Sequence, residues 1–275
     1  MQVKPHVYAM HIDDGAVTHP GGSNNYFVGD PNEDMVLIDT GDHHRAWTKS
    51  ILDYYKALGS PKITGILITH SHSDHIGGLD RIQEATGAPV RCHPKLAERL
   101  RKMVGKEAVV SLRSREIIKT GGGGATLRAL FTPGHEVDHV CYYLSQDRVL
   151  FTGDTILGGS STTVGDLSSY MKSLHLLSSF RHDTICPAHG PVVHPPHGAR
   201  LVQQYISHRN EREEQVLAAL AKGITDVTEI VRDIYPRSLK RGLRHAAERN
   251  VQTQLTKLTK EGRVAVSPAR YSLKG

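Results

Sequence analysis

Four side chains that can bind a metal ion lie within six residues of one another: His70, His72, Asp74 and His75. They follow a short apolar, β-branched run at 63–69, which predicts a strand. On extended backbone His70 and His72 point to the same side, so both imidazoles can reach one ion, whereas Asp74 and His75 begin the next helix and face a second. Because a single catalytic zinc uses three protein ligands and an open position, four such side chains indicate two metal sites.

Three further residues of the metal-binding type occur downstream, at His135, Asp154 and His189. Each follows a short apolar run and a Gly or Pro turn, and α/β sheets place their chemistry on loops outside the strand ends. A lone histidine after a Pro-Gly turn is more often an ordinary surface residue. Together with the cluster at 70–75, however, the three are expected to complete a two-metal centre.

The rest of the chain predicts an α/β fold. Extended runs at 3–12, 26–28 and 35–38 indicate a β meander. Helices are then expected at 45–58, 76–86, 95–104, 166–180 and 198–222, and strands at 90–92, 126–131, 140–144, 149–152 and 184–186. The glycine run 121–124 is expected to be a loop or hairpin, because it lacks the GKS or GKT ending of a phosphate-binding loop.

The last quarter of the chain predicts a separate small domain. A helix at 226–235, one or two helices within 237–261 and a hairpin formed by 263–266 and 271–273 follow the order of a winged helix. We therefore predict a catalytic domain at 1–207 and a winged-helix domain at 208–275. The charged helix 198–222 could pair two subunits in a homodimer or merely tether the two domains.

The positive charge of the chain gathers in this tail. Lys and Arg number 34 against 28 Asp and Glu, and residues 208–275 alone contain 14 basic and 8 acidic residues, which accounts for the whole excess of six. Four cations have the i, i+3, i+4, i+7 spacing that would place them on one face of a helix: Arg237, Lys240, Arg241 and Arg244. Such a stripe would suit contacts with a phosphate backbone or with a nucleotide-bearing thioester. A solvated basic face is the alternative. Aromatic residues make up only 5% of the chain, so base-stacking platforms are few.

Neither the apolar runs nor the cysteines indicate a membrane or secreted protein. No run approaches the ~20 apolar residues that span a bilayer, and no leader pattern is seen at the N-terminus, so we expect a cytoplasmic protein without a membrane partner. Cys92, Cys141 and Cys186 are odd in number and widely separated, and each is expected to be a buried strand residue without a disulfide.

The ordered motifs at 36–41, 69–75, His135, Asp154 and His189 resemble the metallo-β-lactamase superfamily. That resemblance implies an αββα sandwich and a hydrolase with two Zn²⁺ ions. It also implies that His70, His72 and His135 hold one zinc, that Asp74, His75 and His189 hold the other, and that Asp154 bridges them. Asp39 would orient a ligand from behind. Its alternative role is to stabilise the turn at Thr40-Gly41.

Details of these motifs indicate which branch of the superfamily the chain resembles. Flavin-linked di-iron relatives carry a carboxylate where this chain has His72, so zinc is expected. Asp154 argues against antibiotic hydrolysis, and the 34 residues between it and His189 leave no room for a β-CASP cap domain. A longer signature resembles the β-lactamase-like protein 2 branch, which includes a single-strand endoribonuclease and polyketide-releasing thioesterases, and it lies mainly at 125–139, 153–167 and 204–210.

The expected nucleophile is a hydroxide held between the two zinc ions, with Asp74 keeping it in line. His139 is either a donor to the developing oxyanion or a structural histidine. The first predicted function is a zinc-dependent endoribonuclease acting on single-stranded RNA, and the second is a thioesterase or another ester or lactam hydrolase. A third possibility, from a different class, is a winged-helix nucleic-acid-binding regulator whose metal site senses zinc.

Overall fold

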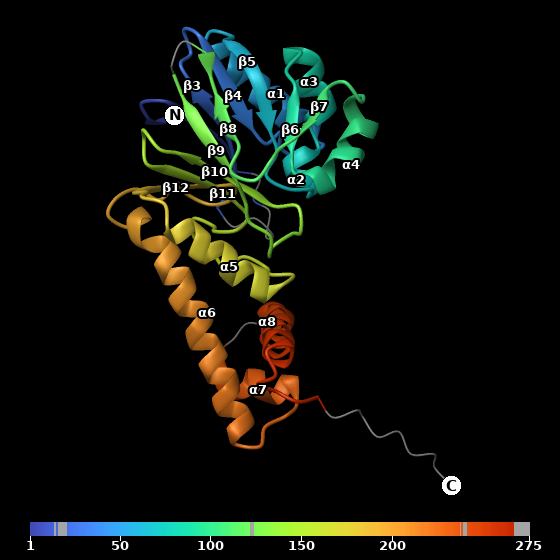
Figure 1. Cartoon of the computed structure of the whole chain (residues 1–275), viewed down its shortest axis with the longest axis vertical. Coiled ribbons are helices and arrows are strands. Elements are labelled where there is room, and N and C mark those ends of the chain that lie inside the picture. Colours follow the sequence, from blue (N-terminus) through green and yellow to red (C-terminus); the bar gives the residue numbers. More distant parts are fainter. Residues whose placement is uncertain (14, 16–20, 122–123, 237, 239–240, 267–275) are drawn as a thin grey trace.

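Two β-sheets lie face to face at the centre of the N-terminal part of the chain (Figure 1). The computed structural model describes residues 1–13, 15, 21–121, 124–236, 238 and 241–266. Within these residues the larger sheet has the order β1 (Gln2–Lys4), β2 (Val7–Ile12), β3 (Ser23–Gly29), β4 (Asp34–Ile38), β5 (Lys62–Leu67), β6 (Val90–Cys92) and β7 (Val109–Ser111). The smaller has the order β12 (Thr184–Pro187), β11 (Val149–Gly153), β10 (Val140–Leu144), β9 (Thr126–Phe131) and β8 (Ile117–Lys119).

Helices cover the outer face of each sheet. The larger sheet carries α1 (Arg45–Ala57), α2 (Ser73–Ile76), α3 (Leu79–Thr86) and α4 (Pro94–Val104). The smaller sheet packs against α5 (Leu167–Ser178) and the first half of α6 (Gly198–Ala221), and α6 then leads away to α7 (Val227–Ile234) and α8 (Arg241–Lys260). This arrangement confirms the predicted αββα sandwich.

Alternating side chains of the central strands fill separate cores. In β10, Tyr142 packs between the two sheets, where Tyr26 and Phe151 meet edge to face at 5.3 Å. Its neighbours Cys141 and Tyr143 point the other way, toward α5 and α6. The two-residue period of a strand thus supplies both layers from one segment. All three cysteines are free and buried, as predicted.

The helix predicted at 76–86 is in fact interrupted by Gly77 and Gly78. A Cβ on Gly77 would lie 2.3 Å from the backbone nitrogen of His43, and one on Gly78 would lie 2.5 Å from the carbonyl oxygen of Thr40. The two glycines therefore let the loop after β4 pack directly on the turn between α2 and α3. Because α2 carries two of the predicted metal ligands, this close contact positions the site.

Strands β7 and β8 were not expected from the sequence, and one expected strand is missing. Residues 263–266 form no strand in the described part of the chain, and the second arm, 271–273, lies outside the described residues. Within this segment, Val264 packs against the small core that α6, α7 and α8 share.

Helix α6 belongs to both parts of the molecule. Its residues Val202 and Ile206 pack with α5 and the smaller sheet, whereas Val216 and Ala219 pack with α7 and α8. The boundary predicted between residues 207 and 208 falls inside this helix and stays a prediction. No helix in the described ranges combines the length and the hydrophobicity needed to cross a bilayer.

Candidate metal centre

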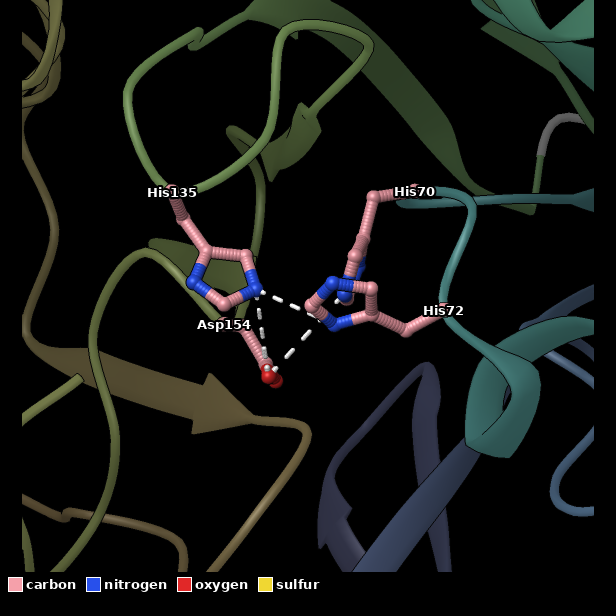
Figure 2. Close-up of side chains that lie close together, drawn as sticks. All are labelled: His70, His72, His135 and Asp154. Carbon is pink, nitrogen blue, oxygen red and sulfur yellow. Dashed lines mark hydrogen bonds and ion pairs between the residues drawn. The ribbon is translucent and has the colours of Figure 1, made fainter. Parts of the chain in front are cut away.

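All seven predicted ligands meet at one end of the β-sandwich. His70 and His72 lie in the loop after β5, and Asp74 and His75 lie in α2. His135, Asp154 and His189 follow β9, β11 and β12. Their ligand atoms form two groups, each within 4.8 Å: His70, His72, His135 and Asp154 in one, and Asp74, His75 and His189 in the other. Figure 2 shows the first group, with the imidazoles and the carboxylate turned toward a common point.

Asp154 lies between the two groups. Its Oδ2 is 3.6 Å from Nε2 of His135 and 4.0 Å from Nε2 of His70. Its Oδ1 is 3.5 Å from Nε2 of His75 and 3.3 Å from Nε2 of His189. Each oxygen therefore faces one group, which is the arrangement that a bridging carboxylate requires.

Four imidazoles are held from behind through Nδ1, which directs Nε2 into the site. The partners are Asp39 Oδ2 for His75 at 2.8 Å, the Thr163 carbonyl for His135 at 2.8 Å, Ser23 Oγ for His189 at 3.0 Å, and Thr69 Oγ1 for His70 at 3.1 Å. His72 has the opposite orientation, since its Nε2 contacts Glu136 Oε1 at 3.0 Å and its Nδ1 lies 3.3 Å from His135 Nε2. Such outer partners are typical of metal-binding histidines.

Asp39 supports the site from a buried position, with 3% of its surface exposed. Its Oδ1 accepts the backbone N–H of Thr69 at 2.8 Å, and its Oδ2 accepts the Thr69 hydroxyl at 2.7 Å besides the imidazole of His75. These bonds connect the end of β4 to the loop after β5. The hydrogen bond with His75 is the contact that the predicted orienting role requires, and the role itself stays a prediction.

His139 lies behind the site, fully buried. Its Nδ1 is hydrogen-bonded with the Thr132 hydroxyl at 2.9 Å, and its Nε2 accepts the backbone N–H of Asp154 at 3.1 Å. Burial, together with the neighbouring imidazole of His135, lowers the pKa of His139 well below its ordinary value, so the ring is neutral. Because both nitrogens contact the protein, the geometry favours the structural alternative over the predicted oxyanion donor.

Several buried polar atoms of the cluster make no hydrogen bond to any residue that the structure describes, among them Nε2 of His70, Nε2 of His75 and Oδ1 of Asp154. Buried polar atoms are normally paired. Burial lowers the pKa of His70 well below its usual range. Burial also lowers that of His75, but the carboxylates, Asp39 foremost, outweigh it and raise the pKa to about 10. Imidazole nitrogens and carboxylates directed at one another in this way fit a pair of divalent cations.

Comparison with known proteins agrees with this geometry. The chain matches the metallo-beta-lactamase superfamily over residues 19–189 and the beta-lactamase associated winged helix domain over residues 227–270. The chain belongs to the metallo-beta-lactamase superfamily. The second match also establishes a C-terminal winged-helix domain.

Relatives within the superfamily carry different names. An atrochrysone carboxyl ACP thioesterase of Passalora fulva is 35% identical, with 88% of this chain and 72% of the relative covered. A beta-lactamase-like protein 2 homolog of Caenorhabditis elegans is 33% identical, with 88% and 80% covered. A metallo-beta-lactamase family protein of Thermus thermophilus is similar in structure, with a TM-score of 0.70, 24% identity and 95% of both chains covered. This last similarity concerns the fold alone.

Some residues around the superfamily site had no sequence signal. Ser23, Glu136 and Thr163 contact ligand imidazoles through a hydroxyl, a carboxylate and a carbonyl that no motif marks. An additional group, Asp42, His43 and His44, brings three metal-competent atoms within 4.8 Å on the surface before α1. The run Asp-His-His is visible in the sequence, but it follows no motif that would mark it as a metal site.

The predicted nucleic-acid-binding residues fall only partly within the structure. Arg237 and Lys240 lie outside the described residues, and the side chain of Arg241 is not described. Arg244 lies in α8 and is half-buried. Their alignment on one face therefore stays a prediction.

Proposed function

We propose that this chain is a dinuclear zinc-dependent hydrolase. The observation that carries the proposal is the pair of donor groups that share Asp154, one carboxylate oxygen facing each. The residues that would hold the first ion are His70, His72 and His135, those for the second are Asp74, His75 and His189, and Asp154 would contact both. A site this rich in imidazole favours zinc over the hard, oxygen-preferring cations.

Zinc in such a site supplies Lewis acidity and an activated water at neutral pH. The chain itself supplies geometry and charge. Asp39 and Ser23 keep the rings of His75 and His189 turned inward, so little reorganisation accompanies the reaction. Asp74, whose Oδ2 lies 3.2 Å from His189 Nε2, can accept a hydrogen bond from the attacking water and hold it in line.

For the substrate, we propose the phosphodiester bonds of single-stranded RNA. The support is the positive excess of residues 208–275, which attracts a polyanion, and the resemblance to a branch that contains an endoribonuclease. The winged-helix domain lies beyond α6 and gives a long substrate a second surface to contact.

An acyl thioester is the second candidate. It is favoured by the similarity to the thioesterase of Passalora fulva. A cleft of about 330 Å³ also lies beside the loop that follows Asp154, with Leu157, Leu201 and Tyr205 in its wall. Its apolar lining suits an acyl group better than a nucleotide.

A substrate panel separates the two candidates. Wild type, Asp74→Ala and the control Asp80→Ala, in which an exposed carboxylate of α3 is removed, are incubated with a labelled RNA oligomer, an acyl-CoA and a lactam. Losing a ligand should reduce turnover by more than the roughly 10–100-fold typical of an outer partner, whereas Asp80→Ala should retain it. RNA cleavage sensitive to Asp74→Ala and to a chelator supports the first candidate.

If the protein turns over only the acyl-CoA, the RNA proposal is wrong and the thioester is the substrate. RNA cleavage that survives Asp74→Ala would indicate a contaminating nuclease and remove the support for this substrate. A wild-type protein that takes up no metal would refute the hydrolase proposal as a whole.

A further inference from the structure

Arg209 lies in the middle of α6 and is buried, with only 5% of its surface accessible. The residues next to it in the sequence, His208 and Asn210, are exposed. Its guanidinium donates to the Thr162 carbonyl at 3.0 Å and to Ser161 Oγ at 3.3 Å. It also lies over the ring of Tyr170, 5.3 Å from the centroid. No ion pair joins it to a carboxylate in the part of the chain that the structure describes. Burying a charge without an ion-pair partner costs free energy, so an arginine at this buried position calls for a specific reason.

The loop that Arg209 contacts also forms hydrogen bonds with a predicted metal ligand, His135. The next carbonyl along the chain, that of Thr163, accepts the Nδ1–H of His135 at 2.8 Å, and the Thr162 hydroxyl lies 3.2 Å from the same nitrogen. Residues 158–165 form neither helix nor strand, and backbone hydrogen bonds hold the loop at its two ends, from Gly158 to the His189 carbonyl and from Gly165 to the Gly134 carbonyl. The middle of the loop, 161–163, is where Arg209 donates. Because the peptide unit between Thr162 and Thr163 is planar, a guanidinium that holds the Thr162 carbonyl also fixes the Cα of Thr163, and only the ψ rotation of Thr163 is left to move the next carbonyl.

The same arginine also connects to the C-terminal domain and to the bridging carboxylate. Its own carbonyl accepts the side-chain amide of Gln254 in α8 at 3.2 Å. The ring beneath it, Tyr170, donates through its hydroxyl to the carbonyl of Thr155 at 2.6 Å, one residue after Asp154. Arg209 therefore lies between the winged-helix domain and the loop that follows Asp154, and this loop in turn contacts His135.

We propose that Arg209 is a positioning residue for metal binding, which acts by holding residues 161–163 so that the Thr163 carbonyl fixes the ring of His135. Through the hydrogen bond between Gln254 and the carbonyl of Arg209, the C-terminal domain would help to keep Arg209 in place. It would thereby support the first group of candidate ligands, His70, His72 and His135. The inference rests on the proposed function, since it assumes that the wild-type chain binds two ions.

Arg212, one turn further along α6, offers a matched control. Its guanidinium lies over the ring of Tyr235 at 4.2 Å and donates to the carbonyl of Ile234 at 3.3 Å. It therefore makes the same kinds of contact on the same helix, but directed toward α7 and away from the ligand loops. A variant at this half-buried position removes the same kinds of contact without the connection to His135.

The experiment compares full-length wild type, Arg209→Ala, Arg209→Lys and Arg212→Ala by zinc competition against a chromophoric chelator, with imidazole NMR signals as a second readout. In Arg209→Ala the affinity of one zinc equivalent should fall about 10–100-fold, while the other stays close to wild type. Arg209→Lys should show a smaller loss of the same equivalent, because an ammonium cannot replace the planar fork. Arg212→Ala should bind both ions as wild type does.

The NMR readout tests the route. The His135 signal should change in both Arg209 variants without metal, and it should stay unchanged in Arg212→Ala. Two equivalents bound with wild-type affinity in the Arg209 variants would overturn the inference, as would an equal loss in Arg209→Ala and Arg212→Ala. If Arg209→Ala does not fold, Arg209→Lys decides by the same criteria. A wild-type chain that binds no zinc would instead refute the proposed function.

Discussion

Asp39 has a backbone φ of 59°, a left-handed conformation that residues other than glycine rarely adopt. The conformation directs its carboxylate across the end of β4 onto Thr69 and His75. Unfavourable backbone conformations persist where the surrounding contacts impose them, and they gather at functional sites. At the scale of one residue, local backbone strain thus accompanies the orientation of an imidazole in the candidate metal centre.

Replacing this carboxylate tests its contribution. In Asp39→Asn, which tolerates the left-handed conformation, His75 loses its charged partner, and zinc affinity of one equivalent should fall about 10–100-fold. Chelator competition measures the change. The control is Asp30→Asn, because Asp30 also accepts a backbone N–H, from Asn32 at 2.9 Å, but it follows the end of β3 opposite to Ser23, whose hydroxyl contacts His189. Unchanged affinity in Asp39→Asn would contradict the orienting role.

Helix α5 shows how one element connects the catalytic domain to the tail. Asp166, the N-cap residue directly before this helix, accepts the backbone N–H of Ser169 at 2.7 Å and a hydrogen bond from the ammonium of Lys260, in α8, at 2.7 Å. The hydrogen bond from Lys260, followed by that from Ser169, lowers the pKa of Asp166 from 3.8 to about 2. The carboxylate therefore caps α5 and contacts the C-terminal domain at once.

This lowered pKa predicts how stability depends on pH. Since the folded state holds the proton more weakly than the unfolded state, the contribution of Asp166 is complete above about pH 4 and is lost as pH falls toward 2. The difference in unfolding free energy between wild type and Asp166→Asn should be constant from pH 5 to 8 and shrink below pH 4. The half-exposed pair limits it to about 1 kcal/mol or less.

Urea unfolding of the metal-free protein measures this difference. Asp226→Asn serves as the control, because Asp226 caps α7 through Glu229 but no ion pair is described for it. A wild-type advantage over Asp166→Asn that persists unchanged to pH 2.5 would contradict the role of Lys260.

The elements and the ligands differed in how far the sequence could predict them. Strands such as β9 and β10 and helices such as α6 have clear periods. Among the ligands, the cluster at 70–75 is a strong signal because four metal-competent side chains lie within six residues, and it gave meaning to the single His and Asp residues after later strands. Strands β7 and β8 have three residues each, too few for a period to be seen. Ser23 and Thr163 contact ligands through a hydroxyl and a carbonyl, groups so common that only tertiary structure identifies them.

At the scale of the whole molecule, the candidate ligands come from both sheets. His70 and His75 follow β5 of the larger sheet, whereas His135, Asp154 and His189 follow strands of the smaller one. Bound ions would therefore link the two halves of the sandwich. A ligand that binds only the folded state stabilises it by RT ln(1 + [L]/Kd), so the stabilisation keeps growing with the ratio of free ligand to Kd.

Metal removal should consequently lower the melting temperature. At a metal concentration 100 times Kd the stabilisation is about 2.7 kcal/mol, which corresponds to about 5–10 °C for a chain of this size. Calorimetry of wild type with zinc and with excess chelator measures the difference. Asp74→Ala should show a smaller shift, and an identical melting temperature in both conditions would argue against ions that link the sheets.

The sharing of α6 by two cores has a consequence for engineering. Each residue of an α-helix turns the chain by about 100°, so deleting one residue between Ile206 and Val216 would swing the far domain around the helix axis. Removal of seven residues would nearly restore the angle while drawing the domain inward by about 10 Å. Chimeras of this chain with its relatives must therefore preserve helical phase across the junction, whatever their degree of identity.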